Sequence, residues 1–350
     1  MNIMEKILIS FFIALAVSYT LTPLANQIAH KIGAIDVPKD ERRIHSTPIP
    51  RLGGLAIYFA FMINALIWTP LSAEFIGIFI AGSLILVCGI VDDTKQISAK
   101  YKLAVQIMAA VIVIYSGVRI EFFTFPFTST GMIYLGVFSI PVTLLWIVGI
   151  TNAVNLMDGL DGLAAGLATI ASISLSIIAF INGQTVVAVL LMSLAGGTLG
   201  FLPYNFNPAK IFMGDTGSLF IGFILAAISV EGVIKSATTV AIIIPVLVLG
   251  VPVLDTAFAI IRRSINGQPI HVADRGHLHH KLLDLGFTQK QTVLVLYSVS
   301  ILLGGVAVLI SGATEMISFV TLVVIIFAIS FGTLGVLFVI NQKRVKHLSK

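Results

Sequence analysis

Five aspartates stand in three polar segments between long apolar runs, and they are the residues of this chain best suited to chemistry. They are Asp92 and Asp93, Asp158 and Asp161, and Asp215. Carboxylate oxygens are hard ligands of the kind that Mg²⁺ takes, and a carboxylate can also act as a base or a nucleophile. Adjacent carboxylates such as Asp92 and Asp93 repel each other unless a cation lies near them. The pattern predicts metal binding or acid–base chemistry.

Each of these aspartates also has a structural interpretation. Asp92 and Asp93 could begin a solvated loop. Asp158 or Asp161 could cap the N-terminus of the helix that follows, and Asp215, which precedes Thr-Gly-Ser, could do the same. Capping leaves unexplained a polar strip whose members are three residues apart, so that neighbours share a helix face: Asn152, Asn155, Asp158 and Asp161.

Three histidines gather in a later segment that also contains Arg275 and Lys281: His277, His279 and His280. Zinc normally takes four ligands, and the single cysteine of the chain lies elsewhere, inside an apolar run. The flanking positive charges favour an anion or phosphate site. A zinc site and a merely exposed polar loop are the alternatives. Leucines at positions 278, 282 and 285 predict a short amphipathic helix on the membrane surface.

One further aspartate, Asp255, lies inside the apolar run 238–261, three residues after Pro252. A charge at the centre of the hydrocarbon costs ~2.5–3.5 kcal/mol on insertion scales, so Asp255 is expected to face the protein interior. It is either a second-tier site residue or a structural partner. Pro245, Gly250 and Pro252 predict that a helix over this run is kinked or broken, because proline removes a backbone donor.

The elements that must position these side chains are apolar. Of the 350 residues, 57% are hydrophobic and 11% are charged, whereas a soluble protein carries roughly a quarter charged residues. Runs of about 20 residues can span a ~30 Å hydrocarbon layer as helices. The sequence predicts an all-α polytopic membrane protein of 10–11 helices in one domain, 1–350. The predicted spans are 7–29, 53–71, 74–91, 102–118, 132–153, 161–181, 186–203, 217–234, 238–261, 292–311 and 316–340.

Positive charge gives the predicted orientation. With eleven spans, 18 Lys and Arg residues fall on one side and 3 on the other. Because basic loops stay in the cytoplasm, the first side is predicted to be cytoplasmic, with the N-terminus outside and the C-terminus inside. The aspartate and histidine segments then share the cytoplasmic face. A secondary transporter would instead carry polar residues near the bilayer midplane.

Five segments together resemble the polyprenyl-phosphate N-acetylhexosamine-1-phosphate transferases. They are "DERRIHSTPIPRLGG", "VDDTKQISAK", "NAVNLMDGLDGLAAG", "NFNPAKIFMGDTGSLFIG" and "DRGHLHHKLLDLG". The resemblance implies transfer of a sugar-1-phosphate from a UDP-sugar to a lipid phosphate, with release of UMP. It implies a multi-pass enzyme of the cell membrane, and no nucleic acid partner. Whether the protein forms a homodimer is left undecided by the sequence.

The resemblance also implies roles for individual residues. Mg²⁺, or Mn²⁺ in its place, would be held by Asp215 and Asp92. The catalytic set would be Asp92, Asp93, Asp158 and Asp161. Substrate contacts would come from His45, Arg51, Lys95, Lys102, Asn152, Asn155, Asn205, Phe212, Arg275, His277, His279 and His280.

The histidine pattern narrows the substrate. His-x-His-His resembles the branch that uses UDP-GlcNAc and undecaprenyl phosphate, at the first membrane step of a cell-envelope polysaccharide or teichoic acid pathway. The phospho-MurNAc-pentapeptide transferases, the alternative, usually have three consecutive histidines. Direct attack by the lipid phosphate is favoured over a covalent carboxylate intermediate, because a phosphate monoester with a second pKa of ~6 is already an anion.

Overall fold

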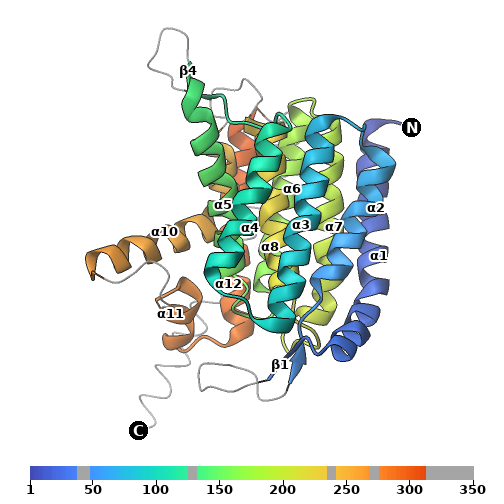
Figure 1. The fold of residues 1–350 in the computed structure, drawn as a ribbon, viewed down its shortest axis with the longest axis vertical. Helices are drawn as coiled ribbons and strands as arrows, with labels where there is room; N and C mark the ends of the chain where they lie inside the picture. Colours follow the sequence, from blue (N-terminus) through green and yellow to red (C-terminus); the bar gives the residue numbers. More distant parts are fainter. Residues whose placement is uncertain (38–47, 125–131, 235–241, 268–275, 313–350) are drawn as a thin grey trace.

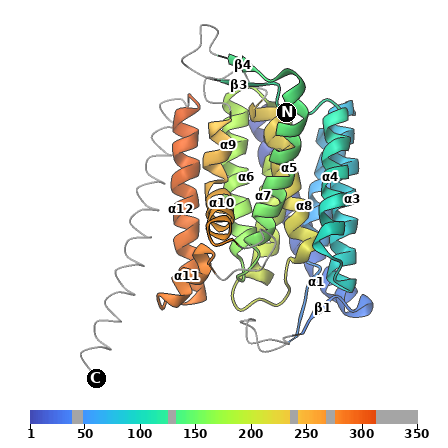
Figure 2. The same cartoon turned by 60° about the vertical axis from the view of Figure 1, so that its left-hand side comes forward.

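The computed structural model describes residues 1–37, 48–124, 132–234, 242–267 and 276–312. Nine helices run side by side along one axis in this part of the chain (Figures 1 and 2). Their bounds are α1 (Ile3–Ile32), α2 (Gly54–Trp68), α3 (Ala73–Lys95), α4 (Ala99–Tyr115), α5 (Ser139–Leu156), α6 (Leu163–Ile181), α7 (Thr185–Asn205), α8 (Gly214–Ile228) and α12 (Gln289–Ile310). The all-α fold predicted from the apolar runs is confirmed.

Seven of the described helices are long and apolar enough to cross a membrane: α1, α3, α5 with the 3-10 turn before it, α6, α7, α8 with the start of the π turn after it, and α12. The 3-10 turn is Gly136–Phe138, and the π turn is Ser229–Ile234. The helices α2 and α4 have 15 and 17 residues. At 1.5 Å per residue they are about 22–26 Å long, shorter than a typical hydrocarbon core. The last predicted span, 316–340, lies outside the described residues.

The remaining elements are short. Two antiparallel strand pairs occur among the described residues: β1 (Ile35–Asp36) with β2 (Ile49–Pro50), and β3 (Phe122–Thr124) with β4 (Met132–Tyr134). Three further helices are α9 (Ile243–Val248), α10 (Gly250–Ile265) and α11 (Leu278–Asp284). Helix α11 confirms the short helix predicted for the histidine segment.

The ninth predicted span is not one helix. It divides at Leu249 into α9 and α10, and α10 leaves the direction of the bundle and projects sideways (Figure 1). The predicted break is therefore confirmed. Pro252 has no N–H to donate to Val248, so the helical hydrogen-bond ladder is interrupted where the chain turns. Side chains on α10 such as Phe258, 63% exposed, do not pack into the bundle.

Helix α8 lies at the centre of the bundle. Each of its residues is buried except Asp215, in its first turn. Glycines let neighbouring helices approach this end closely, as in other membrane bundles. A Cβ at Gly54 of α2 would overlap the backbone of Gly217, and a Cβ at Gly89 of α3 would overlap the backbone of Thr216. Backbone contact therefore fixes where α8 begins relative to α2 and α3.

The polar segments gather at one end of the bundle. The α3–α4, α5–α6 and α7–α8 connections lie there with β1, β2 and α11, at the end opposite the N-terminus (Figure 1). The prediction that these segments share a side is confirmed. The helices thus bring together four stretches that are far apart in the sequence.

Candidate active site

Asp93 holds the N-terminus of α8 from the neighbouring helix α3. Its Oδ1 accepts a hydrogen bond from the backbone N–H of Asp215 at 3.1 Å. Its Oδ2 accepts from the Thr216 N–H at 2.9 Å and the Thr216 hydroxyl at 2.6 Å. Asp93 is 3% exposed. Both oxygens are thus engaged with helix donors that would otherwise be unpaired, and the geometry makes Asp93 a positioning residue for Asp215.

Gly214 allows this close contact. Its φ is +72°, and a Cβ there would overlap Asp93 Oδ2 and crowd the Arg51 carbonyl oxygen. The N-terminus of α8 is therefore capped by a residue 122 positions earlier in the chain. The alternative in which Asp215 is only a helix cap is wrong, because Met213 is the N-cap of α8 and the first-turn N–H groups bond to Asp93.

Asp92 and Asp215 meet around one ammonium group. Lys102 Nζ donates to Asp215 Oδ2 at 2.8 Å and lies 3.3 Å from Asp92 Oδ2. The other oxygen of each carboxylate has its own donor. Asp215 Oδ1 accepts from Asn155 Nδ2 at 3.0 Å, and Asp92 Oδ1 accepts from the Ile97 N–H at 3.0 Å. Three of the predicted site residues, on α3, α4 and α8, thus form one charged cluster.

Two other asparagines of the predicted site also have partners within the protein. Asn152 exchanges hydrogen bonds with Gln106 of α4, at 2.5 and 3.4 Å. Asn205 accepts from the Gly162 N–H at 3.1 Å and donates to the Ile211 carbonyl at 3.1 Å, and it is 2% exposed. Asn205 therefore joins the α5–α6 turn to the α7–α8 connection, and its role in the site is to hold these two segments together.

The α5–α6 turn carries Asp158 and Asp161. Helix α6 has Gly162 as its N-cap, with φ +80°, so the predicted capping by either aspartate is wrong. Asp161 accepts from Asn207 Nδ2 at 2.9 Å and from the Ala209 N–H at 3.1 Å, which orders the α7–α8 connection. Burial, reinforced by nearby carboxylates of which Asp215 is the foremost, raises the pKa of Asp158 to about 8. Such a carboxyl group can take up or release a proton near neutral pH.

Arg51 and Phe212 lie beside the start of α8. They form an isolated parallel bridge, in which the Phe212 N–H donates to the Pro50 carbonyl at 2.8 Å. The Arg51 guanidinium lies 3.8 Å from Asp36. Lys95, at the end of α3, is exposed. Of the predicted substrate contacts, His45 and Arg275 lie outside the described residues.

The histidine segment is anchored by Asp255. The Asp255 carboxylate lies 2.6 Å from His277 Nδ1 and accepts from the Leu278 N–H at 2.7 Å. The sequence left Asp255 divided between a site role and a structural one, and the structure makes it the partner of His277. The two residues are 22 positions apart, so the sequence did not show that they are partners. It indicated only that a buried carboxylate such as Asp255 needs a partner of some kind.

The His279 ring lies between the rings of two other histidines. Its ring is 5.7 Å from that of His277 at 8°, and 4.3 Å from that of His280. Burial lowers the pKa of His279 to about 4, so the ring is neutral at pH 7. A Cβ at Gly159 would meet His279 Nε2 at 2.9 Å, which places the ring against the turn that carries Asp158. The described residues contain no group of three His, Cys, Asp or Glu suited to a metal ion, so the zinc alternative has no support there.

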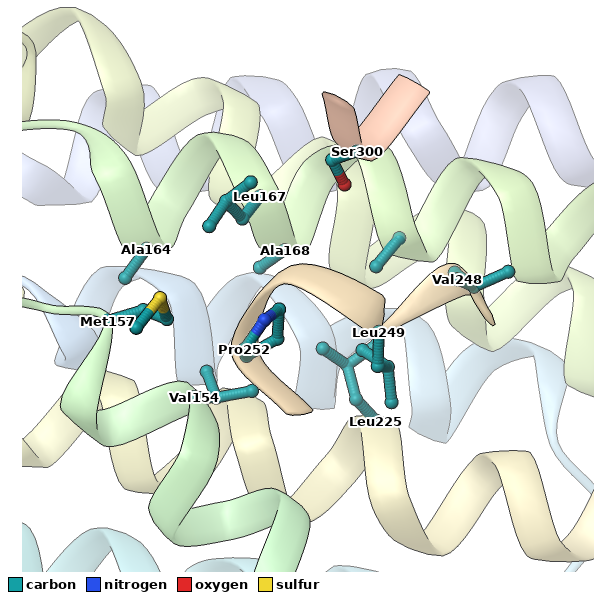
Figure 3. Close-up of a pocket in the computed structure, with 11 residues that line it drawn as sticks. Val154, Met157, Ala164, Leu167, Ala168, Leu225, Val248, Leu249, Pro252 and Ser300 are labelled. Carbon is teal, nitrogen blue, oxygen red and sulfur yellow. The ribbon is translucent and has the colours of Figure 1, made fainter. Parts of the chain in front are cut away.

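An apolar pocket opens between the helices next to this turn. Val154 and Met157 line it from the α5 side, Leu167 from α6 and Leu225 from α8 (Figure 3). The α9–α10 break supplies Leu249 and its neighbours Val248 and Pro252. Met157 directly precedes Asp158, so the pocket lies beside the turn of the carboxylates. Residues at the α9–α10 break thus line this pocket, which the proline pattern alone did not indicate.

Comparison with known proteins agrees with this arrangement. The sequence profile of glycosyl transferase family 4 matches residues 75–233. A probable undecaprenyl-phosphate N-acetylglucosaminyl 1-phosphate transferase of Bacillus subtilis is 43% identical over 330 residues, which cover 93% of this chain and 90% of the relative. A decaprenyl-phosphate N-acetylglucosaminephosphotransferase of Mycobacterium leprae is 36% identical over 313 residues, covering 81% and 78%.

A second branch matches over a shorter stretch. A phospho-N-acetylmuramoyl-pentapeptide-transferase of Listeria innocua is 40% identical over 197 residues, which cover 52% of this chain and 60% of the relative. The match to the Bacillus subtilis protein, by contrast, extends over nearly the whole of both chains. The chain therefore belongs to glycosyl transferase family 4, the polyprenyl-phosphate N-acetylhexosamine-1-phosphate transferases that its polar segments resemble.

Proposed function

We propose that this membrane protein transfers GlcNAc-1-phosphate from UDP-GlcNAc to undecaprenyl phosphate, giving undecaprenyl-diphospho-GlcNAc and UMP. The observation that carries the proposal is the meeting of Asp92 and Asp215 around Lys102. This end of the bundle thus offers two carboxylates for a cation and an ammonium group for a diphosphate. The names of the relatives above add support for the polyprenyl phosphate and the sugar.

A divalent cation fits this site. Asp92 and Asp215 already share one positive charge through their Oδ2 atoms, and carboxylate oxygens are the ligands that Mg²⁺ prefers. Mg²⁺ usually takes one or two carboxylates and completes its shell with water and substrate phosphate, so it does not require a larger cluster of protein ligands. Asp215 and Asp92 would hold Mg²⁺, with Mn²⁺ as a substitute. Bound there, the ion would neutralise charge on the donor diphosphate.

The protein residues then have distinct tasks. Asp93 fixes the start of α8, and Asn155 orients Asp215 by donating to its Oδ1. Lys102 supplies a positive charge for the diphosphate, which phosphoryl transfer requires. An oxygen of the lipid phosphate attacks the β-phosphorus of UDP-GlcNAc, the P–O bond to UMP breaks, and UMP leaves with the bonding electrons. Because the lipid phosphate, with a second pKa of ~6, is already an anion near neutral pH, its attack does not depend on a carboxylate base, and Asp92 serves as a ligand of the cation.

The pocket beside the α5–α6 turn has an empty volume of about 300 Å³, which can admit a short part of the acceptor lipid and not the whole undecaprenyl chain. An undecaprenyl chain is hydrocarbon, and its phosphate must lie at the membrane surface. A chain entering between α5, α6 and the α9–α10 break would place its phosphate near Asp158. By the positive-inside rule this end of the bundle faces the cytoplasm, where UDP-GlcNAc is found, with the N-terminus outside and the C-terminus inside.

The second candidate activity is transfer of phospho-MurNAc-pentapeptide, which the partial similarity to the Listeria innocua protein favours. The deciding experiment uses the purified full chain with undecaprenyl phosphate and Mg²⁺, and measures UMP release. UDP-GlcNAc should support turnover and the UDP-MurNAc-pentapeptide should not. Turnover with the pentapeptide donor alone would assign the protein to the other branch.

A further inference from the structure

Lys102 holds the same two oxygen atoms that a divalent cation would need. Of the four carboxylate oxygens of Asp92 and Asp215, the two Oδ1 atoms accept from the Ile97 N–H and the Asn155 amide. The two Oδ2 atoms both face Lys102 Nζ, at 3.3 and 2.8 Å. The Lys102 side chain is 25% exposed and those of Asp92 and Asp215 are 13% and 23% exposed, so water screens these charges only in part.

The donors to these oxygens differ in freedom. The Ile97 N–H belongs to the backbone of the α3–α4 turn, and the Asn155 amide is held by a second hydrogen bond to the Ser218 hydroxyl at 2.8 Å. The ammonium of Lys102 sits on a four-carbon chain with several rotatable bonds. When a divalent cation binds these two carboxylates, it repels the positive charge of Lys102. Lys102 is the donor that can move away, because its side chain is flexible.

We propose that Lys102 and the divalent cation exchange places at Asp92 and Asp215, and that the released ammonium binds the diphosphate of the nucleotide donor. The first step stands on the contacts above. The second rests on the proposed function, which supplies the diphosphate. Because a bound diphosphate gives the ammonium a new anionic partner, cation and donor strengthen each other's binding, and such coupling is reciprocal.

The first test measures cation affinity without any substrate. Mn²⁺ is titrated into the detergent-purified full chain, and free Mn²⁺ is quantified by electron paramagnetic resonance. Lys102→Met removes the competing charge and should bind Mn²⁺ more tightly, on the order of tenfold, which corresponds to about 1.4 kcal/mol. Lys100→Met is the matched control, because Lys100 is an exposed lysine on the same helix. It should stay within about twofold of wild type. Unchanged or weaker binding by folded Lys102→Met protein would overturn the exchange.

A second test uses the unaltered protein and does not depend on a variant that folds. Lysines are acylated by an amine-reactive ester with and without Mg²⁺, and the labelling of each lysine is quantified by mass spectrometry. Release of Lys102 should raise its labelling several-fold when Mg²⁺ is present, while the labelling of Lys100 should not change. Equal labelling of Lys102 with and without saturating Mg²⁺ would contradict the proposal.

A third arm separates the exchange from the proposed activity. UDP-GlcNAc should tighten Mn²⁺ binding more in wild type than in Lys102→Met protein, because only wild type has an ammonium to pass to the diphosphate. If the first two tests succeed and UDP-GlcNAc has no effect on either protein, the exchange stands and the donor assignment fails. If UDP-GlcNAc tightens both equally, the second step of the proposal is wrong.

Discussion

Asp93→Asn tests whether Asp93 positions the site or reacts in it. The carboxylate accepts three hydrogen bonds, two of them from backbone N–H groups at the start of α8. An asparagine keeps one acceptor oxygen and turns an NH₂ group toward the remaining donors. Leaving a buried donor unpaired costs ~1–3 kcal/mol, and losing a hydrogen bond to a charged acceptor costs a similar amount. We therefore expect a loss of stability of about 2–4 kcal/mol.

Asp92→Asn is the matched comparison. Asp92 accepts from the Ile97 N–H and Lys102, and Lys102 keeps its shorter contact with Asp215 after the change. The loss of stability should then be under about 1 kcal/mol, as for a partly exposed ion pair. Asp93→Asn should thus lose both activity and stability, whereas Asp92→Asn should lose activity alone.

The assay can use the single cysteine. Cys88 is 6% exposed within α3, so a thiol-reactive dye reports thermal unfolding of the detergent-purified protein. Asp93→Asn should lower the apparent melting temperature by roughly 4–8 °C, at about 2 °C per kcal/mol for a chain of this size. Turnover is measured in parallel as UMP release. An unchanged melting temperature with turnover lost to the same degree as in Asp92→Asn would refute the positioning role.

Four further results are expected. Asp215→Asn should lower turnover by at least about a hundredfold and weaken its Mg²⁺ dependence; near-normal activity and Mg²⁺ response would contradict the metal assignment. Cysteines at positions 51, 95 and 281 should react with a reagent added from the cytoplasmic side, and a cysteine at position 119 with one added from outside. Position 281 is used for the histidine segment because Lys281 is exposed whereas His279 is buried, and labelling of position 281 from outside alone would reverse the topology. The folded-state pKa of Asp158, about 8, is above the ordinary value near 4, so the folded protein keeps a proton that the unfolded chain has lost. Stability should therefore fall as pH rises from about 4 to 8. Asp158→Asn should flatten this pH dependence of the melting temperature, and an unchanged slope in the variant would contradict the raised pKa of Asp158. With lipid phosphate stripped, labelled UMP should not enter UDP-GlcNAc; exchange that is lost in Asp92→Asn would establish a covalent intermediate in place of direct attack.

The sequence predicted what depends on local composition. Apolar runs are long enough to mark the helices, and polar residues in a membrane protein are costly enough that their clustering indicates a site. The approach of Asp92 to Asp215 followed from the predicted topology and is found in the structure. The break at Leu249 followed from Pro245, Gly250 and Pro252, because proline acts on its own backbone.

The parts that could not be predicted depend on contacts between distant segments. Capping by Asp158, Asp161 or Asp215 was judged from neighbouring residues alone. In the structure the donors of α8 bond to Asp93, and Asp161 bonds to the α7–α8 connection, 46 and 48 residues away. The direction of α10 was equally hidden, since a broken ladder allows a turn but does not set its angle. The division of tasks between Asp92 and Asp93 required knowing which of them α8 covers.

The contacts of Gly54 and Gly89 with α8 also limit which substitutions this protein can accept during evolution. Elsewhere in the core, volume-conserving exchanges of apolar side chains are usually tolerated. At these two glycines a single added methyl group would push α8 away from α2 or α3, and Asp215 would move with it. Variation in substrate preference is therefore expected to accumulate in the polar connections and the pocket lining. The separation of Asp92 from Asp215 is expected to stay the same, because it is set by contact between the backbones of α3 and α8 at Gly89 and Thr216.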